Sequence, residues 1–285
     1  MSAPLEVSLR FDPRDKLLIG ALALVLSPVL FALGKSWWNS DHMSHGFLVP
    51  IVSAFVAVDR RSALAAVPAV VDRRGLLALA VALLAALAGP LAGSLTLAGA
   101  GVVGCVVSVV WFRRGAAWLS VLTFPLAYLL FMVPPPEELH GLLVNWLQGW
   151  ASSASVAGLY TLGVPVFLEG YVIEMVGGMR VEVAEACSGA TSLYTLTAIG
   201  VLLAFMSLAR RRTRALLVAL VFPVAMVGNL ARVVATVLLC IQFGVARATS
   251  GILHTALGLL TYVVAVGLLL AADALLRRYE KRLAP

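Results

Sequence analysis

The chain has 285 residues, of which 61% are hydrophobic and only 12% are charged. A soluble domain is about half apolar and about a quarter charged, so this chain has too few polar residues to cover a soluble fold of its length. The mean hydropathy of +1.00 agrees with this conclusion. The composition therefore excludes an ordinary soluble domain and predicts that lipid surrounds most of the fold.

In a soluble protein the net charge of +7 would suggest a nucleic-acid partner. Here the basic residues stand in short clusters between apolar runs, a distribution that is typical of membrane orientation instead. We therefore expect the basic residues to orient the chain in the lipid bilayer, and we expect no nucleic-acid partner.

Apolar runs that approach the ~20 residues of a spanning helix recur along the whole chain. In chain order they cover residues 16–33, 46–58, 75–91, 95–112, 116–133, 187–209, 215–242 and 252–276. No small-residue cleavage site follows the first run, which we expect to be an uncleaved span. The sequence predicts an all-α polytopic membrane protein with about eight transmembrane helices, organised as a single membrane-embedded domain over residues 1–285.

The segment 134–186 is the longest stretch without a spanning run. Three consecutive prolines at 134–136 end the preceding helix. Residues 137–162 then follow an amphipathic helical pattern with two tryptophans, which are typical anchors at headgroup level. Residues 171–185 alternate apolar with polar side chains around two glycines, which predicts a β-hairpin. We expect an extracytoplasmic insert that leads directly to Cys187.

The basic residues predict the orientation of the spans. With the N-terminus in the cytoplasm, the cytoplasmic segments hold all but four of the 21 basic residues. The four exceptions are Lys35, Arg180, Arg232 and Arg247. By the positive-inside rule, and with an even number of spans, both termini lie in the cytoplasm and the insert lies outside.

Cys187 is the first candidate for chemistry. It lies in this topology at the outer N-terminal end of a span, where the helix dipole favours a nucleophilic thiolate. Ser188 is small and allows a substrate to approach, and Glu185 can attract or repel a charged one. Cys105 and Cys240 stand within apolar runs and are expected to be buried, chemically inert side chains. The three cysteines show neither a zinc pattern nor a disulfide framework.

Arg232 and His254 are two further polar residues in apolar surroundings. An arginine within a span costs roughly 2.5–3.5 kcal/mol on insertion scales, so it normally faces a polar interior and serves a function. Arg232 has Asn229 beside it, and snorkelling to the headgroups is its alternative explanation. His254 begins the last span, at the same predicted face, and histidine suits proton transfer near neutral pH. A thiol, a guanidinium and an imidazole on one face form a coherent acyl-transfer site.

A polar loop at residues 37–46 joins the first two spans. His42, His45 and Asp41 permit a metal-binding interpretation, but a polar interfacial loop explains them without one, and we expect no metal site. The functional role that we prefer for the loop is substrate contact, with His45 as its candidate residue.

Three groups of residues carry a resemblance to a known family: Ala186-Cys187-Ser188-Gly189, Asn229-Leu230-Ala231-Arg232, and His254 with the apolar helix after it. Residues 44–50 and 130–134, the pair Leu147-Gln148 and the glycine-containing approach to the hairpin also match. On these residues the sequence resembles the exosortase/archaeosortase family over most of its length, from about Trp37 to Gly267.

The resemblance implies a membrane cysteine transpeptidase or protease. It would cleave C-terminal sorting signals of the Pro-Glu-Pro type from membrane-anchored exported proteins, through a thioester acyl-enzyme, and transfer them to an unidentified acceptor. Cys187 would be the nucleophile, His254 the proton-transfer residue and Arg232 the group that stabilises the oxyanion or positions the scissile carbonyl. The resemblance also implies the inner membrane of a Gram-negative bacterium, and acyl transfer requires no cofactor.

Two other functions remain compatible with the sequence. A non-enzymatic component of exopolysaccharide assembly or export would need the bundle of spans but not Cys187. A transporter could hold an anionic substrate at Arg232, although transporters place such residues near the membrane midplane rather than at one face.

Overall fold

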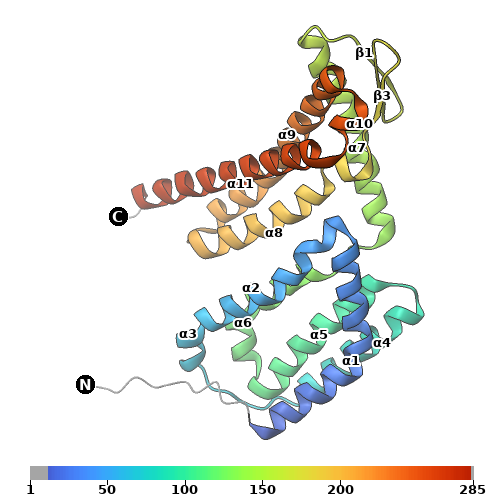
Figure 1. Cartoon of the computed structure of the whole chain (residues 1–285). Coiled ribbons are helices and arrows are strands. Elements are labelled where there is room, and N and C mark those ends of the chain that lie inside the picture. The colour runs from blue at the N-terminus through green and yellow to red at the C-terminus, as the bar shows by residue number, and fades with distance from the viewer. Residues whose placement is uncertain (1–11, 284–285) are drawn as a thin grey trace. The chain divides into compact units, whose positions relative to one another are not determined.

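The computed structural model describes residues 12–283, apart from the side chain of Ala186. The chain divides into two compact units, Met1–Pro136 and Glu137–Pro285, called unit 1 and unit 2 below (Figure 1). The single domain expected over residues 1–285 stays a prediction.

Over its described residues, unit 1 contains helices and no strand. Its elements are α1 (Pro13–Asn39), the 3-10 segment η1 (Asp41–Phe47), α2 (Leu48–Asp59), α3 (Arg61–Ala65), α4 (Arg74–Leu91), α5 (Leu95–Arg114), α6 (Ala116–Tyr128) and η2 (Leu129–Met132). Two side chains hold η1 and the end of α1 to η2. The Trp37 indole donates to the carbonyl of Met132 at 2.9 Å, and His45 Nε2 to that of Phe131 at 3.1 Å.

Helices α4 and α5 pack closely because small residues face one another. A Cβ atom on Gly101 of α5 would lie 2.3 Å from the backbone nitrogen of Ala86 on α4, so only glycine permits this approach. Small residues at a helix contact are the usual means by which spanning helices associate, since lipid supplies no hydrophobic force between them.

Unit 2 combines helices with a small sheet. Its elements are α7 (Glu137–Thr161), β1 (Val166–Glu169), β2 (Val172–Met175), β3 (Arg180–Glu182), the 3-10 turn η3 (Glu185–Cys187), α8 (Ala190–Ser207), α9 (Arg211–Phe243), α10 (Val245–Ala248) and α11 (Gly251–Arg282). Helix α9 packs against both α8 and α11 (Figure 1).

The sheet is antiparallel in the order β1-β2-β3. The predicted hairpin corresponds to β2 and β3, whereas β1 was not predicted. Arg180 on β3 is paired with Glu174 on β2, and its Nη2 lies 3.0 Å from that carboxylate and 2.8 Å from Glu169 on β1. The hydrogen bond with Glu174 is the main cause that raises the pKa of Arg180 above its ordinary value.

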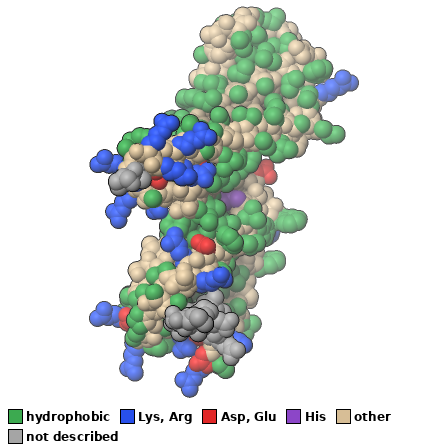
Figure 2. Space-filling view, turned by 90° about the vertical axis from the view of Figure 1, so that its left-hand side faces the viewer, with side chains coloured by type: hydrophobic (Ala, Val, Ile, Leu, Met, Phe, Trp, Pro, Cys, Tyr) green, Lys and Arg blue, Asp and Glu red, His purple; other side chains and the backbone are tan. Residues whose placement is uncertain are grey.

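The helices confirm the expected fold class. Within residues 12–283, seven helices are long and apolar enough to cross a membrane, and the number is eight if α6 and α7 together form one broken span. Hydrophobic side chains cover broad areas of the face shown in Figure 2. The expected span 116–133 is shorter than its neighbours, since α6 ends at Tyr128 and continues only as the 3-10 turn η2 before the prolines.

Candidate active site

Cys187 is the last residue of the 3-10 turn η3 and not the first residue of a helix. Helix α8 begins at Ala190, and the hydroxyl of Ser188 accepts a hydrogen bond from the Ala190 backbone at 3.2 Å. The sequence-based placement of the thiol at a helix start was therefore close, but a turn of two residues separates them. The thiol still precedes the positive end of the α8 dipole.

Gly189 makes this turn possible for two reasons. Its φ of 93° lies in the left-handed region that side chains rarely adopt. A Cβ atom at this position would also lie 2.8 Å from the side-chain Cγ of Asn229 on α9. The turn that carries Cys187 is thus pressed against Asn229, and a residue larger than glycine would separate them.

Asn229 binds the backbone of the turn. Its Nδ2 donates to the carbonyl oxygens of Cys187 at 3.1 Å and of Ser188 at 3.0 Å. Both Asn229 and Ser188 are buried. Their observed role is to hold the turn, and the substrate contacts expected for them stay predictions.

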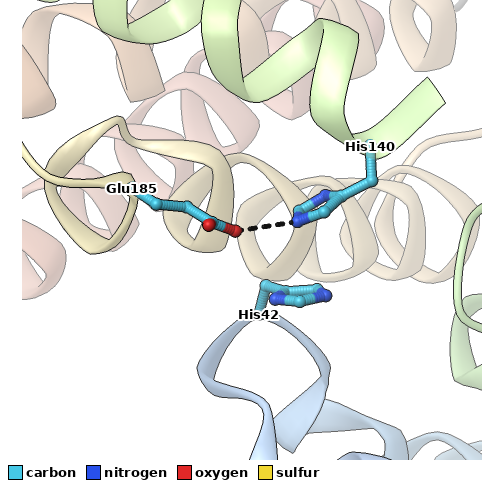
Figure 3. A group of neighbouring side chains, drawn as sticks. All are labelled: His42, His140 and Glu185. Carbon is cyan, nitrogen blue, oxygen red and sulfur yellow. Dashed lines mark hydrogen bonds and ion pairs between the residues drawn. The ribbon is translucent and has the colours of Figure 1, made fainter. Parts of the chain in front are cut away.

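Helix α7 holds the same segment from another direction. Gln148 is buried and donates through Nε2 to the carbonyl of Val183 at 2.9 Å. Two helical turns earlier, His140 Nε2 donates to the Glu185 carboxylate at 3.1 Å, as Figure 3 shows. The other ring nitrogen of His140 lies 3.1 Å from the hydroxyl of Tyr194 on α8. Sequence reasoning identified neither Gln148 nor His140 as a site residue.

A cavity of about 220 Å³ lies beside Cys187 within unit 2. Its wall includes Cys187, Arg232 of α9 and His254 of α11, so the structure brings together the three residues that the sequence singled out. The remaining wall comes from residues 181–184, from Thr249 and from three further residues of α9. Glu182 is the one carboxylate among these lining residues.

Arg232 and His254 are in direct contact. Arg232 Nη2 lies 3.2 Å from His254 Nε2. Because a guanidinium only donates, Nε2 accepts this bond, and the ring proton of His254 sits on Nδ1. The guanidinium packs against bare backbone, since a Cβ atom on Gly258 would lie 3.4 Å from its Cζ. Gly258 stands one helical turn after His254, a spacing that places both on one face of α11.

Two nitrogen atoms of this pair have no hydrogen-bond partner among residues 12–283. They are Arg232 Nε and His254 Nδ1, and both are buried. In the same part of the chain, Cys187 forms no side-chain hydrogen bond with either residue. The cavity therefore offers buried donors beside a thiol, a combination that suits a carbonyl group.

The other site residues expected from the sequence lie elsewhere. Glu185 is exposed and bonded to His140 rather than lining the cavity. His45 lies in unit 1, on η1, and its expected role in substrate contact stays a prediction. Cys105 and Cys240 are free and buried, as expected. Among the residues described, unit 2 holds no group of three His, Cys, Asp or Glu side chains placed to bind a metal ion.

Comparison with known proteins places the chain in a family. The transmembrane exosortase family matches residues 37–271, which is most of the chain. Searches of curated proteins and of solved structures found no match. The family match covers the turn of Cys187, Arg232 on α9 and His254 on α11, and the chain belongs to the transmembrane exosortase family.

Proposed function

We propose that the chain is a membrane cysteine transpeptidase that cleaves C-terminal sorting signals of exported, membrane-anchored proteins and transfers the cleaved protein to an acceptor. One observation carries this proposal. Cys187, Arg232 and His254 come from three separate segments and line one cavity of about 220 Å³.

The first step is attack of the Cys187 thiolate on the scissile carbonyl. His254 takes the thiol proton on Nε2, whose lone pair is directed at Arg232 before the substrate enters. A new C–S bond forms, and the carbonyl oxygen becomes an oxyanion. The C–N bond then breaks, and the leaving amine takes the proton back from His254, which yields a thioester.

Arg232 is suited to stabilise the oxyanion. Its Nε is a buried donor without a partner in the described chain, so the substrate oxygen can bind there without displacing another bond. A donor that is already oriented toward the position of developing charge contributes more than one that must reorganise. The fixed guanidinium against Gly258 provides this orientation.

The second step releases the protein from Cys187. An amine of the acceptor attacks the thioester carbonyl and gives a proton to His254, a new C–N bond forms, and the C–S bond breaks, so that the Cys187 thiolate is regenerated and is reprotonated from His254. If water takes the place of the amine, the same site acts as a protease. The masses of the products separate the two outcomes, because hydrolysis leaves a free carboxylate and transfer adds the mass of the acceptor.

The distribution of arginines supports a site at the outer face of the inner membrane, with both termini in the cytoplasm. In this orientation, substrates that have already been exported reach Cys187 without returning across the bilayer. Their own hydrophobic anchors would keep them in the plane of the membrane beside the cavity.

The test is co-expression of the full chain with an exported reporter that ends in a Pro-Glu-Pro-type signal. Wild type should convert the reporter to a shorter form, and Cys187→Ala should lower conversion by roughly 10³-fold or more. Cys105→Ala is the matched control, since that thiol is buried in α5, and its conversion should stay near that of wild type.

Equal conversion by wild type and Cys187→Ala would overturn the proposal and would favour a non-enzymatic role in polysaccharide assembly. A second reporter, with its Pro-Glu-Pro replaced by three alanines, shows whether the signal itself is read. Its conversion at the wild-type rate would reject the proposed substrate class while leaving the cysteine chemistry intact.

A further inference from the structure

A second cavity lies in unit 1, remote in sequence from Cys187. It has a volume of about 220 Å³ and is bounded by the first turns of α1 and α6, the last turns of α2 and α5, and α3. All of these are helix ends that the arginine distribution assigns to the cytoplasmic side. The residues that decide its chemistry are Asp15, Arg113, Arg114 and Trp118.

The charged lining of this cavity has an excess of positive charge. Asp15 is buried and forms an ion pair with Arg113. Arg114 reaches the same carboxylate only at 3.8 Å, so one carboxylate faces two guanidiniums. Asp12 lies 3.8 Å from Arg113 but is half-exposed and outside the lining. Arg114 is therefore the cation that a bound anion would meet.

Trp118 adds a hydrogen-bond donor. It is only 9% exposed, and its Nε1 has no hydrogen-bond partner among residues 12–283. A buried donor without a partner is destabilising, and buried indoles usually find an acceptor. The Arg114 guanidinium lies 5.1 Å from the centre of the Trp118 ring, so the cation and the unsatisfied donor are neighbours. The first turn of α6, which carries Trp118, also has the positive end of the helix dipole.

The remaining wall is apolar and partly exposed, as expected for a surface that faces lipid. Ile19, Val58 and Leu122 contribute to it, and Ile19 and Val58 are 44% and 48% exposed. A small hydrophilic anion would gain nothing from such a wall. A molecule with an anionic head and an aliphatic chain would use both parts of the cavity.

We propose that this cavity binds an anionic phospholipid, with the phosphate at Arg114 and Trp118 and an acyl chain along Ile19 and Val58. Basic pockets between spanning helices on the cytoplasmic side are recognised binding sites for anionic headgroups. A zwitterionic lipid is less suitable, because its ammonium group would need a carboxylate and Asp15 is already paired with Arg113.

The test uses the purified, delipidated full chain in detergent and native mass spectrometry. Dioleoyl phosphatidylglycerol and dioleoyl phosphatidylcholine carry the same chains, so their difference reports the headgroup alone. Wild type should retain phosphatidylglycerol about tenfold more tightly, because the phosphate is the same in both lipids and only phosphatidylcholine adds an ammonium group, which the excess positive charge of the cavity repels. Arg114→Gln should remove this preference, and Trp118→Phe should weaken both lipids, because both carry phosphate oxygens.

Arg212→Gln is the matched control, since Arg212 is exposed at the start of α9 in unit 2. The proposal fails if wild type shows no headgroup preference, or if Arg114→Gln and Arg212→Gln lose it equally.

A third experiment replaces the lipid by inorganic phosphate. If phosphate raises the unfolding temperature as much as phosphatidylglycerol does, free phosphate is the ligand and the lipid proposal is wrong. Trp118→Phe removes the Nε1 donor but keeps an aromatic ring at this position, so it remains informative if Arg114→Gln does not fold.

Discussion

Asn229 links the backbone of the Cys187 turn to α9, the helix that also carries Arg232. Its amide donates to two carbonyl oxygens, and it occupies the space that Gly189 leaves without a side chain. Asn229 and Arg232 stand three residues apart, so they share one face of α9. A displacement of Asn229 would therefore move the proposed nucleophile relative to its proposed partner.

Replacing Asn229 by leucine tests this positioning role. Leucine keeps the volume but leaves the carbonyls of Cys187 and Ser188 without their donor, and for the buried Ser188 this costs about 1–3 kcal/mol. We expect a lower unfolding temperature and a slower reaction of Cys187 with iodoacetamide in the folded protein. Asn145→Leu is the control, because Asn145 is exposed on α7. An alkylation rate equal to that of wild type would show that the turn does not depend on this amide.

The contact between Arg232 and His254 leads to a second expectation at the residue scale. Arg232→Lys keeps a positive charge but removes the Nε donor and the planar group that packs on Gly258. If Nε stabilises the oxyanion, reporter conversion should fall by roughly 10²–10³-fold, even though the charge remains. A variant with nearly normal conversion would show that charge alone is needed, and the role of Nε would be rejected.

At this scale the sequence revealed the residues that are anomalous in an apolar chain. Arg232 and His254 were recognisable because polar groups within spans are costly, and Cys187 because it precedes a span. Neither Gln148, which entered only as part of a family match, nor His140 was identified as a site residue. Their positions in an amphipathic helix suggest nothing unusual, and their partners Val183 and Glu185 become neighbours only through tertiary packing.

Helix α7 serves as the support of the segment that ends at Cys187. Gln148 and His140 are eight residues apart, which places them on one face of the helix. They bind Val183 and Glu185, so the segment just before the nucleophile is held at both ends. Both contacts come from side chains of the single helix α7, which limits how far the turn of Cys187 can move.

Gln148→Leu should loosen this support without creating a cavity. The Val183 carbonyl would lose its donor while the apolar surroundings remain filled, so we expect a loss of about 1–3 kcal/mol in unfolding free energy. Limited proteolysis between β3 and η3 should become faster in the folded protein. Gln242→Leu is the matched control, since Gln242 is exposed near the end of α9. Unchanged protection of the segment would mean that α7 does not hold it.

The elements were predictable to different degrees, for a physical reason. The long apolar runs correspond to α1, α4, α5, α8, α9 and α11, because length and hydropathy are local properties of the sequence. Strand β1 was missed, since it begins with three consecutive apolar residues and shows no alternation. A hairpin of two strands is complete without a third strand. The pattern of β2 and β3 therefore does not predict the turn that brings β1 beside β2.

At the scale of the whole molecule, the arginine clusters and the proposed active site predict the same orientation of unit 2 across the membrane. The clusters at the start of α9 and at the end of α11 are placed together by Glu280, which accepts from the backbone of Ala209 at 3.0 Å and of Arg210 at 2.9 Å. Both clusters therefore lie at the same end of the helices of unit 2. Cys187 precedes α8, at the opposite end of that helix.

This arrangement predicts which side of the membrane each end of unit 2 faces. In spheroplasts, a membrane-impermeant maleimide should label Cys187 in a chain whose Cys105 and Cys240 are replaced by alanine, because the turn would face the periplasm. A cysteine introduced at Arg278, in the last turns of α11, should be labelled only after the membrane is opened, since the positive-inside rule keeps that cluster in the cytoplasm. Labelling of both positions in intact spheroplasts would indicate leakage, which a cytoplasmic marker protein detects. The reverse pattern would place Cys187 in the cytoplasm, where exported substrates do not reach it, and would contradict the proposed function even if the thiol is reactive.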